Sequence, residues 1–168
     1  DERTVHALAM RGRMHQRFGD ADSARADLEA AREAMQRHRT GGAALAMVLD
    51  DLGSLQLQAG QPSQADALFL KAHDQRLREL GGEHPDIAIG YANRARAQHE
   101  LFNVPAALSL SQQAYHHCAT YDGAESRQAA VYLGARGFGL CRSGRWRTRS
   151  CGARPTCCPS CCWRRSSP

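Results

Sequence analysis

The sequence predicts an all-α protein built as a row of stacked helix pairs. A turn-like segment returns every 41 or 42 residues, and its first residues are Gly19, Gly60, Phe102 and Gly144. Seven residues before each of these lies a tiny residue: Gly12, Gly53, Ala95 and Gly137. A period of this length is typical of helical repeats, in which each unit packs on its neighbours. The 168 residues hold about three and a half units and no alternating apolar run of strand type.

The first unit, residues 4–42, consists of two helices joined at Gly19-Asp20. In its first helix, apolar and small residues recur at helical spacing from Val5 to Gly12. The second helix, predicted over about residues 21–37, carries one apolar stripe. The stripe consists of Ala24, Leu28, Ala31 and Met35.

The second unit, residues 43–84, is predicted to form helices over about residues 43–59 and 62–80. Proline is tolerated in the first turn of a helix, which suits Pro62. Gly81 and the glycine after it end the second helix, because glycine adopts the left-handed conformation that closes helices.

The third unit, residues 85–123, begins at Pro85, and its second helix is predicted to begin near Pro105. A final helix over about residues 124–142 opens an incomplete fourth unit that ends at residue 146. The whole array is therefore predicted to cover residues 4–146.

Small side chains recur where the two helices of a unit are expected to cross. On the second helices these are Ala24, Ala65 and Ala107. A leucine at such a crossing would hold the helix axes apart. Four residues later a larger side chain, Leu28 or Phe69, fills the remaining space, whereas the third unit has Ser111 there.

The net charge of +5 comes from the end of the chain. Residues 142–168 hold seven arginines and no acid, which leaves 15 basic and 17 acidic residues in the rest, a net of −2. We therefore expect no nucleic-acid partner. No apolar run approaches the ~20 residues that span a membrane, so no membrane partner is expected either.

The other compositional features concern origin and compartment. One lysine stands against 21 arginines, which suggests a GC-rich and hence bacterial coding sequence. The helical region contains only Cys118 and Cys141, needs no disulfides, and is expected to be cytoplasmic. Because the chain does not begin with Met, we expect it to be a fragment of a longer protein.

The helical pattern breaks after Trp146. Residues 147–168 are rich in Cys, Arg, Pro and Ser and cannot form an amphipathic helix. We interpret this irregular, disordered tail as a frameshift product, since GC-rich DNA read out of frame favours these residue types. A zinc site is the alternative, with ligands from Cys151, Cys157, Cys158, Cys161 and Cys162. Without a partner helix, the final helix would remain uncapped and could self-associate.

No catalytic or metal motif stands out. His116, His117 and Cys118 form the densest cluster, but adjacent helical residues point about 100° apart and cannot easily chelate one ion. The sequence contains no phosphate-binding glycine loop, HExxH or GxSxG motif. We predict that the chain is not an enzyme and needs no cofactor or metal.

The segment LGGEHPDIA at residues 80–88, followed by Tyr91-Ala92-Asn93-Arg94-Ala95, carries a family resemblance. It resembles the inter-repeat linker and first helix of tetratricopeptide repeats (TPRs) of the 42-residue kinesin-light-chain type. The linkers at residues 40–42 and 121–123 lack the His-Pro pair. The resemblance implies a right-handed α-solenoid whose first helices line a concave, non-catalytic groove for a protein or peptide ligand.

The resemblance also implies which residues face the groove. Those selected as binding residues are Arg13, Arg17, Asp50, Ser54, Asn93, Arg96 and Phe138. The other groove positions that it implies are His6, Ala9, Met10, Met47, Asp51, Gln58, Ile89, Ala92, Glu100, Ala135 and Arg142. Asn93 matches the family's asparagine that holds a peptide backbone, and a primary amide suits that role because it both donates and accepts hydrogen bonds. Arg13 and Arg96 could each bind a carboxylate through two hydrogen bonds.

Two functions follow from this interpretation. The chain is either a protein–protein interaction scaffold in its own right or the sensory or docking segment of a larger bacterial signalling protein. In the second case a serine/threonine kinase or transcriptional regulator would be encoded upstream, and its catalytic or regulatory activity would lie there.

Overall fold

The computed structural model describes residues 2–38 and 42–123, together with Ser126, Gln128 and Tyr132. This part of the chain contains six α-helices, a π-helical turn and no strand, as predicted. The helices are α1 (Glu2–Phe18), α2 (Ala21–His38), α3 (Gly42–Gln58), α4 (Pro62–Leu80), α5 (Ile87–Glu100) and α6 (Val104–Cys118), and the turn is Ala119–Gly123. The predicted bounds agree closely, except that α5 begins two residues after Pro85 because Pro85 and Asp86 form a turn.

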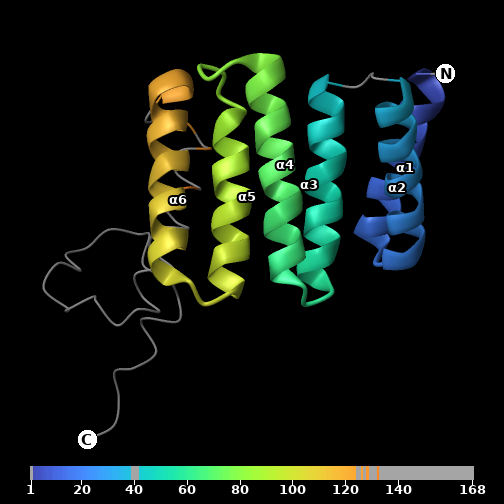
Figure 1. Cartoon of the computed structure of the whole chain (residues 1–168), viewed down its shortest axis with the longest axis horizontal. Helices are drawn as coiled ribbons and strands as arrows, with labels where there is room; N and C mark the ends of the chain where they lie inside the picture. The colour runs from blue at the N-terminus through green and yellow to red at the C-terminus, as the bar shows by residue number, and fades with distance from the viewer. Residues whose placement is uncertain (1, 39–41, 124–125, 127, 129–131, 133–168) are drawn as a thin grey trace, which may run out of the picture.

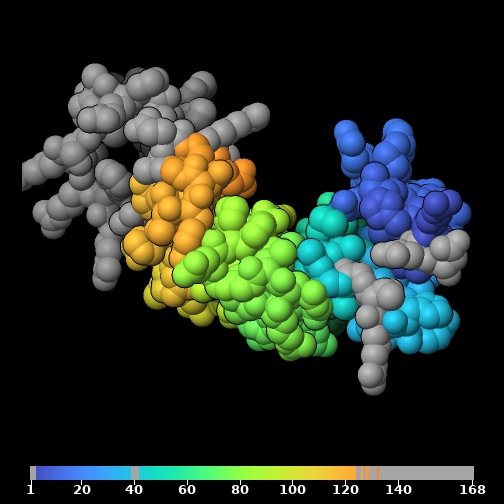
Figure 2. All heavy atoms as spheres, turned by 90° about the horizontal axis from the view of Figure 1, so that it is seen from above, coloured from blue at the N-terminus to red at the C-terminus, as the bar shows by residue number. Residues whose placement is uncertain are grey.

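The helices stand side by side in pairs along a row (Figure 1). α1 packs on α2, α3 on α4 and α5 on α6, while α2–α3 and α4–α5 contacts join one unit to the next. The first helices of neighbouring units also touch, α1 with α3 and α3 with α5. Seen from above, the units follow one another along a bent row (Figure 2). The array therefore lacks a single central core, and its cohesion comes from neighbouring helices.

The turn inside each unit has the same geometry three times. Gly19, Gly60 and Phe102 have positive φ angles of 83°, 73° and 59°. Each N–H bonds the carbonyl three residues earlier, and the next residue's N–H bonds the carbonyl five residues before it. This hydrogen-bond pattern closes the C-terminus of a helix and requires a left-handed residue. The recurring residues in the sequence are therefore the helix-closing residues of the three units.

The close crossing of the two helices in a unit depends on glycine. A Cβ atom added at Gly53 would lie 2.5 Å from Cε1 of Phe69, and one at Gly12 would lie 2.8 Å from Cγ of Leu28. Phe69 and Leu28 are fully buried, so neither can easily move away. The crossing alanines Ala24, Ala65 and Ala107 are also buried.

Several predictions concern residues outside those that the structure describes. Most of the helix predicted at 124–142, including Gly137 and Phe138, lies outside the described residues. So do the tail 147–168, for which a frameshift and a zinc site were considered, and the uncapped end that was expected to self-associate. Of that helix, Gln128 and Tyr132 are described and are helical, and Tyr132 is buried.

Candidate functional site: a groove along α5

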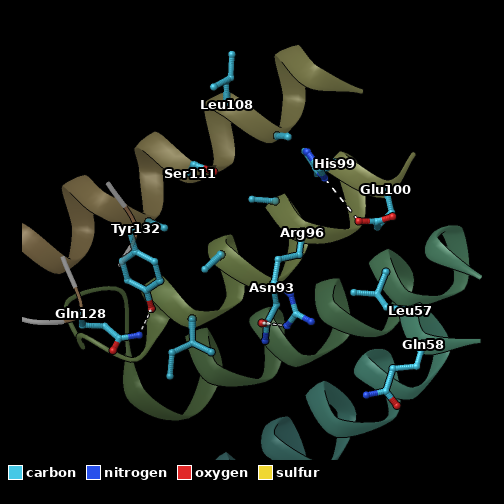
Figure 3. A pocket seen from close by; sticks show the side chains of 15 residues that line it. Leu57, Gln58, Asn93, Arg96, His99, Glu100, Leu108, Ser111, Gln128 and Tyr132 are labelled. Atoms are coloured by element: carbon cyan, nitrogen blue, oxygen red, sulfur yellow. Dashed lines mark hydrogen bonds and ion pairs between the residues drawn. The ribbon is translucent and has the colours of Figure 1, made fainter. Parts of the chain in front are cut away.

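A groove of about 840 Å³ follows α5 (Figure 3). The end of α3 forms one side, the second and third turns of α6 form part of the floor, and two residues after the π-helical turn complete it. The described lining residues are Leu57, Gln58, Ile89, Ala92, Asn93, Ala95, Arg96, His99, Glu100, Ala107, Leu108, Ser111, Ala114, Gln128 and Tyr132. This volume is in the range of sites that hold a drug-sized molecule or a few side chains of a peptide.

Asn93 and Arg96 lie together in the groove, on successive turns of α5 (Figure 3). A guanidinium N–H of Arg96 donates a hydrogen bond to Oδ1 of Asn93 at 3.4 Å. This bond is long and uses one of the five guanidinium N–H groups. Arg96 is exposed and Asn93 is half-buried, so a ligand can reach both. The pair offers an amide and a cation to one ligand.

Each end of the groove has its own polar pair. Nε2 of Gln128 donates a hydrogen bond to the hydroxyl of Tyr132 at 3.1 Å. Burial raises the pKa of the Tyr132 phenol, which keeps it protonated and able to donate. At the opposite end, Nδ1 of His99 lies 3.6 Å from Oε1 of Glu100. The Glu100 carboxylate makes this end less positive than the centre.

The apolar part of the lining follows from a departure in the repeat pattern. Leu28 and Phe69 fill the crossing in units one and two, but the same position holds Ser111 in unit three. Ser111 faces the groove beside Ala95 and Ala107. In unit two the ring of Phe69 fills the space at the helix crossing. In unit three the side chains at the same crossing are small, so the corresponding space contributes to the groove.

Among the described residues, Gln58 is the only position predicted on α1 and α3 that lines this groove, and Arg13, Arg17, Asp50 and Ser54 lie elsewhere. Arg13 donates a hydrogen bond from Nε to Oδ2 of Asp51 at 2.5 Å, which links α1 to α3. Burial raises the pKa of the Asp51 carboxyl, although Arg13 opposes that shift. Arg17 is exposed near the end of α1, and Ser54 is half-buried on α3. The guanidinium of Arg13 is therefore already bonded to a carboxylate of the protein itself.

Asp50 lies inside the protein, between α3 and α4. Only 8% of its surface is exposed, and its Oδ2 accepts a hydrogen bond from Nη2 of Arg76. Sequence reasoning assigned Asp50 to the groove, but its burial makes it part of the packing between α3 and α4. The helical periodicity places positions 50 and 51 about 100° apart, so only one of two adjacent aspartates can face a given neighbour.

Leu57, His99, Leu108, Ser111, Gln128 and Tyr132 line the groove without having been selected as binding residues. A signal existed for one of them, because Ser111 departs from the large residue expected at its position.

No group of three or more His, Cys, Asp or Glu side chains in the described ranges could hold a metal ion. Among the helices of the same ranges, none is both long and apolar enough to cross a membrane.

No protein-family model and no curated protein matches this sequence. A solved structure does match: BtubC (BKLC) from P. vanneervenii, at a TM-score of 0.62 and 15% sequence identity. The match covers 90% of this chain and 66% of the other, so the chain spans just under two thirds of that protein's length. At this identity the likeness concerns the fold, and it shows that the chain has the fold of a TPR-type α-solenoid.

Proposed function

We propose that the chain is a protein-interaction scaffold that binds a peptide segment of a partner protein in the groove along α5. The observation that carries this proposal is the groove of about 840 Å³, with Asn93 and Arg96 at its centre. The amide of Asn93 would pair with the ligand's backbone, and Arg96 would bind a carboxylate or a backbone carbonyl. The small side chains of Ala95, Ala107 and Ser111 would admit an apolar side chain of the ligand.

The proposal assigns binding rather than catalysis to the groove. Its lining is mainly apolar, and Asn93 and Arg96 suit recognition more than proton transfer at neutral pH. Cys118 is free and buried, which agrees with a role in the reducing cytoplasm. A docking segment of a longer signalling protein would use the same groove in the same way.

Peptide selection followed by titration tests this proposal. Peptides selected from a random library on the purified chain are measured by calorimetry against wild type, Asn93→Ala and Arg96→Ala. We expect each substitution to weaken binding by about tenfold, equivalent to about 1.4 kcal/mol for one lost charge-assisted or backbone hydrogen bond.

A matched control is Gln113→Ala on α6, because Gln113 is exposed and does not line the groove. Its affinity should equal that of wild type. Unchanged affinity in both groove variants, or a library that yields no binding peptide, would contradict the proposal.

A further inference from the structure

The interface between α4 and α5 contains a histidine in place of ordinary apolar packing. His73 on α4 is 5% exposed, and its ring occupies the space beside Gly90 of α5. A Cβ atom added at Gly90 would overlap Nδ1 of His73 and lie 2.8 Å from both Cβ and Cγ. The absence of a side chain at Gly90 therefore makes room for the imidazole between the second and third units.

His73 has no hydrogen-bond acceptor ready for an added proton. Its Nδ1 is buried and has no hydrogen-bond partner among the described residues. The ring lies against Tyr91 of α5, with ring centroids 4.5 Å apart and planes tilted by 52°. An imidazolium at this position would bury a charge and a second N–H donor without a partner, which is costly.

The charged and titratable groups around His73 come from α4, α5 and α6. Arg94 of α5, Arg76 of α4 and His117 of α6 disfavour a positive charge on the ring, and Asp74 of α4 favours it. Arg76 and Arg94 are themselves paired with carboxylates, those of Asp50 on α3 and Asp66 on α4. These pairs reduce the repulsion, so desolvation is the largest obstacle to charging His73.

His117 extends the same contact to the linker between the units. One of its ring nitrogens, Nε2, lies 2.8 Å from the backbone oxygen of Gly82 and donates a hydrogen bond to it in the Nε2–H tautomer. Its ring centroid lies 6.4 Å from that of Tyr91. A displacement of His73 and Tyr91 would therefore affect the packing of α4, α5 and α6 together.

We propose that the contact of His73 with Gly90 and Tyr91 is a pH-sensitive joint between the second and third units, which is closed at neutral pH and opens in mild acid. The joint does not depend on the proposed binding function. Because α5 carries Asn93 and Arg96 while α3 carries Leu57 and Gln58, opening the joint would also change the width of the groove.

The direction of the pH effect follows from the titration of His73. Burial, with Arg94 second, lowers the pKa of His73 below its ordinary value of 6.5. The open or unfolded state therefore binds the proton more readily than the closed state. The stability of the joint is fully present above about pH 6.5 and falls as the pH decreases, until His73 is protonated in both states.

Amide hydrogen exchange between pH 7.5 and pH 5 tests the joint in the complete chain. Protection factors, corrected for the intrinsic pH dependence of exchange, should fall severalfold at the α4–α5 contact in acid. The variant His73→Gln removes the titrating group, and its protection at this contact should not change with pH. His116→Gln is the matched control, because His116 is exposed on α6, and it should behave like wild type.

NMR titration of the labelled histidines in wild type gives an independent measurement that needs no variant. We expect His73 to titrate below 6.5 while the chain is folded. A His73 that titrates at or above 6.5, or an equal acid-induced loss of protection in His73→Gln, would overturn the proposal. If His73→Gln does not fold, wild type decides: its protection at the α4–α5 contact must fall over the pH range in which His73 titrates, and unchanged protection there would also overturn the proposal. Since neither measurement uses a peptide, failure of the joint and failure of the binding function are distinguishable.

Discussion

Among the described residues, Phe102 is the one non-glycine residue that adopts a positive φ, and its turn is therefore costly. Gly19 and Gly60 adopt positive φ without a side chain, but unit three places a phenylalanine there at φ 59°. An L-residue with a Cβ in this conformation costs roughly 1–2 kcal/mol. The backbone hydrogen bonds of the turn are nonetheless the same as in the other units, so the surrounding helices impose the conformation on Phe102.

We predict that Phe102→Gly stabilises the protein by about 1 kcal/mol. Glycine adopts the left-handed conformation freely, and part of that gain is offset by the greater entropy of the unfolded chain. The measurement is the free energy of unfolding in urea. The converse change, Gly60→Ala, should destabilise by a similar amount, because a Cβ atom there meets nothing within 4 Å and only the φ of 73° opposes it. A destabilised Phe102→Gly would show that side-chain contacts of Phe102 outweigh the backbone strain.

A buried ion pair, Arg76 with Asp50, joins α4 to α3. The side chains of Arg76 and Asp50 are 5% and 11% exposed and hydrogen-bonded to each other. Nη1 of Arg76 and Oδ1 of Asp50 are buried and have no hydrogen-bond partner among the described residues. Such a pair adds little net stability over apolar residues of similar volume, but breaking it leaves an uncompensated buried charge.

We predict that Asp50→Ala destabilises the protein by about 3–5 kcal/mol, because the Arg76 guanidinium stays buried without its carboxylate. The double variant Asp50→Ala with Arg76→Met should recover much of the loss, since it removes both charges. Thermal or urea unfolding of the single and double variants measures this coupling. Asp27→Ala is the comparison for an exposed cation: it leaves the Arg11 guanidinium without its carboxylate, but 62% of the Arg11 side chain is exposed to solvent, so a much smaller change is expected. Equal losses for Asp50→Ala and Asp27→Ala would contradict the role of burial.

At the scale of the whole molecule, contacts connect mainly neighbouring helices. α1 and α2 contact mainly each other and α3, and the groove is built from α3, α5 and α6 with Gln128 and Tyr132. In such an array stability is approximately a sum of units and of the interfaces between them. The first unit should therefore contribute to stability without being needed for the groove.

We predict that a chain beginning at Gly42 stays helical but less stable, because Val48, Leu52 and Leu55 of α3 lose their contacts with α2. Its affinity for peptides selected on the full chain should remain within about threefold of the original, a change below about 0.7 kcal/mol. Circular dichroism and calorimetry check the two parts of this prediction. Loss of binding by a folded truncated chain would show that the first unit takes part in recognition.

The sequence alone was sufficient for the all-α fold and, to within about two residues, for the bounds of the described helices and the turns inside the units. These depend on local rules: glycine at left-handed positions, proline in first turns, and small residues at helix crossings. The family resemblance also pointed to Asn93 and Arg96, and both lie among the described lining residues of the groove. Because these features recur every 41 or 42 residues, the helices and turn of one unit predict those of the next.

The tertiary structure decided which outward-facing polar groups remain available. Arg13 is bonded to Asp51, Asp50 is buried with Arg76, and Ser111 opens a volume that Phe69 closes in the preceding unit. It also placed His73 against Gly90, which are 17 residues apart on different helices. Helical periodicity gives the direction of each side chain from its own axis, but the distance to a partner on another helix depends on how the helices pack. Pairing, burial and cavity volume are consequences of that packing.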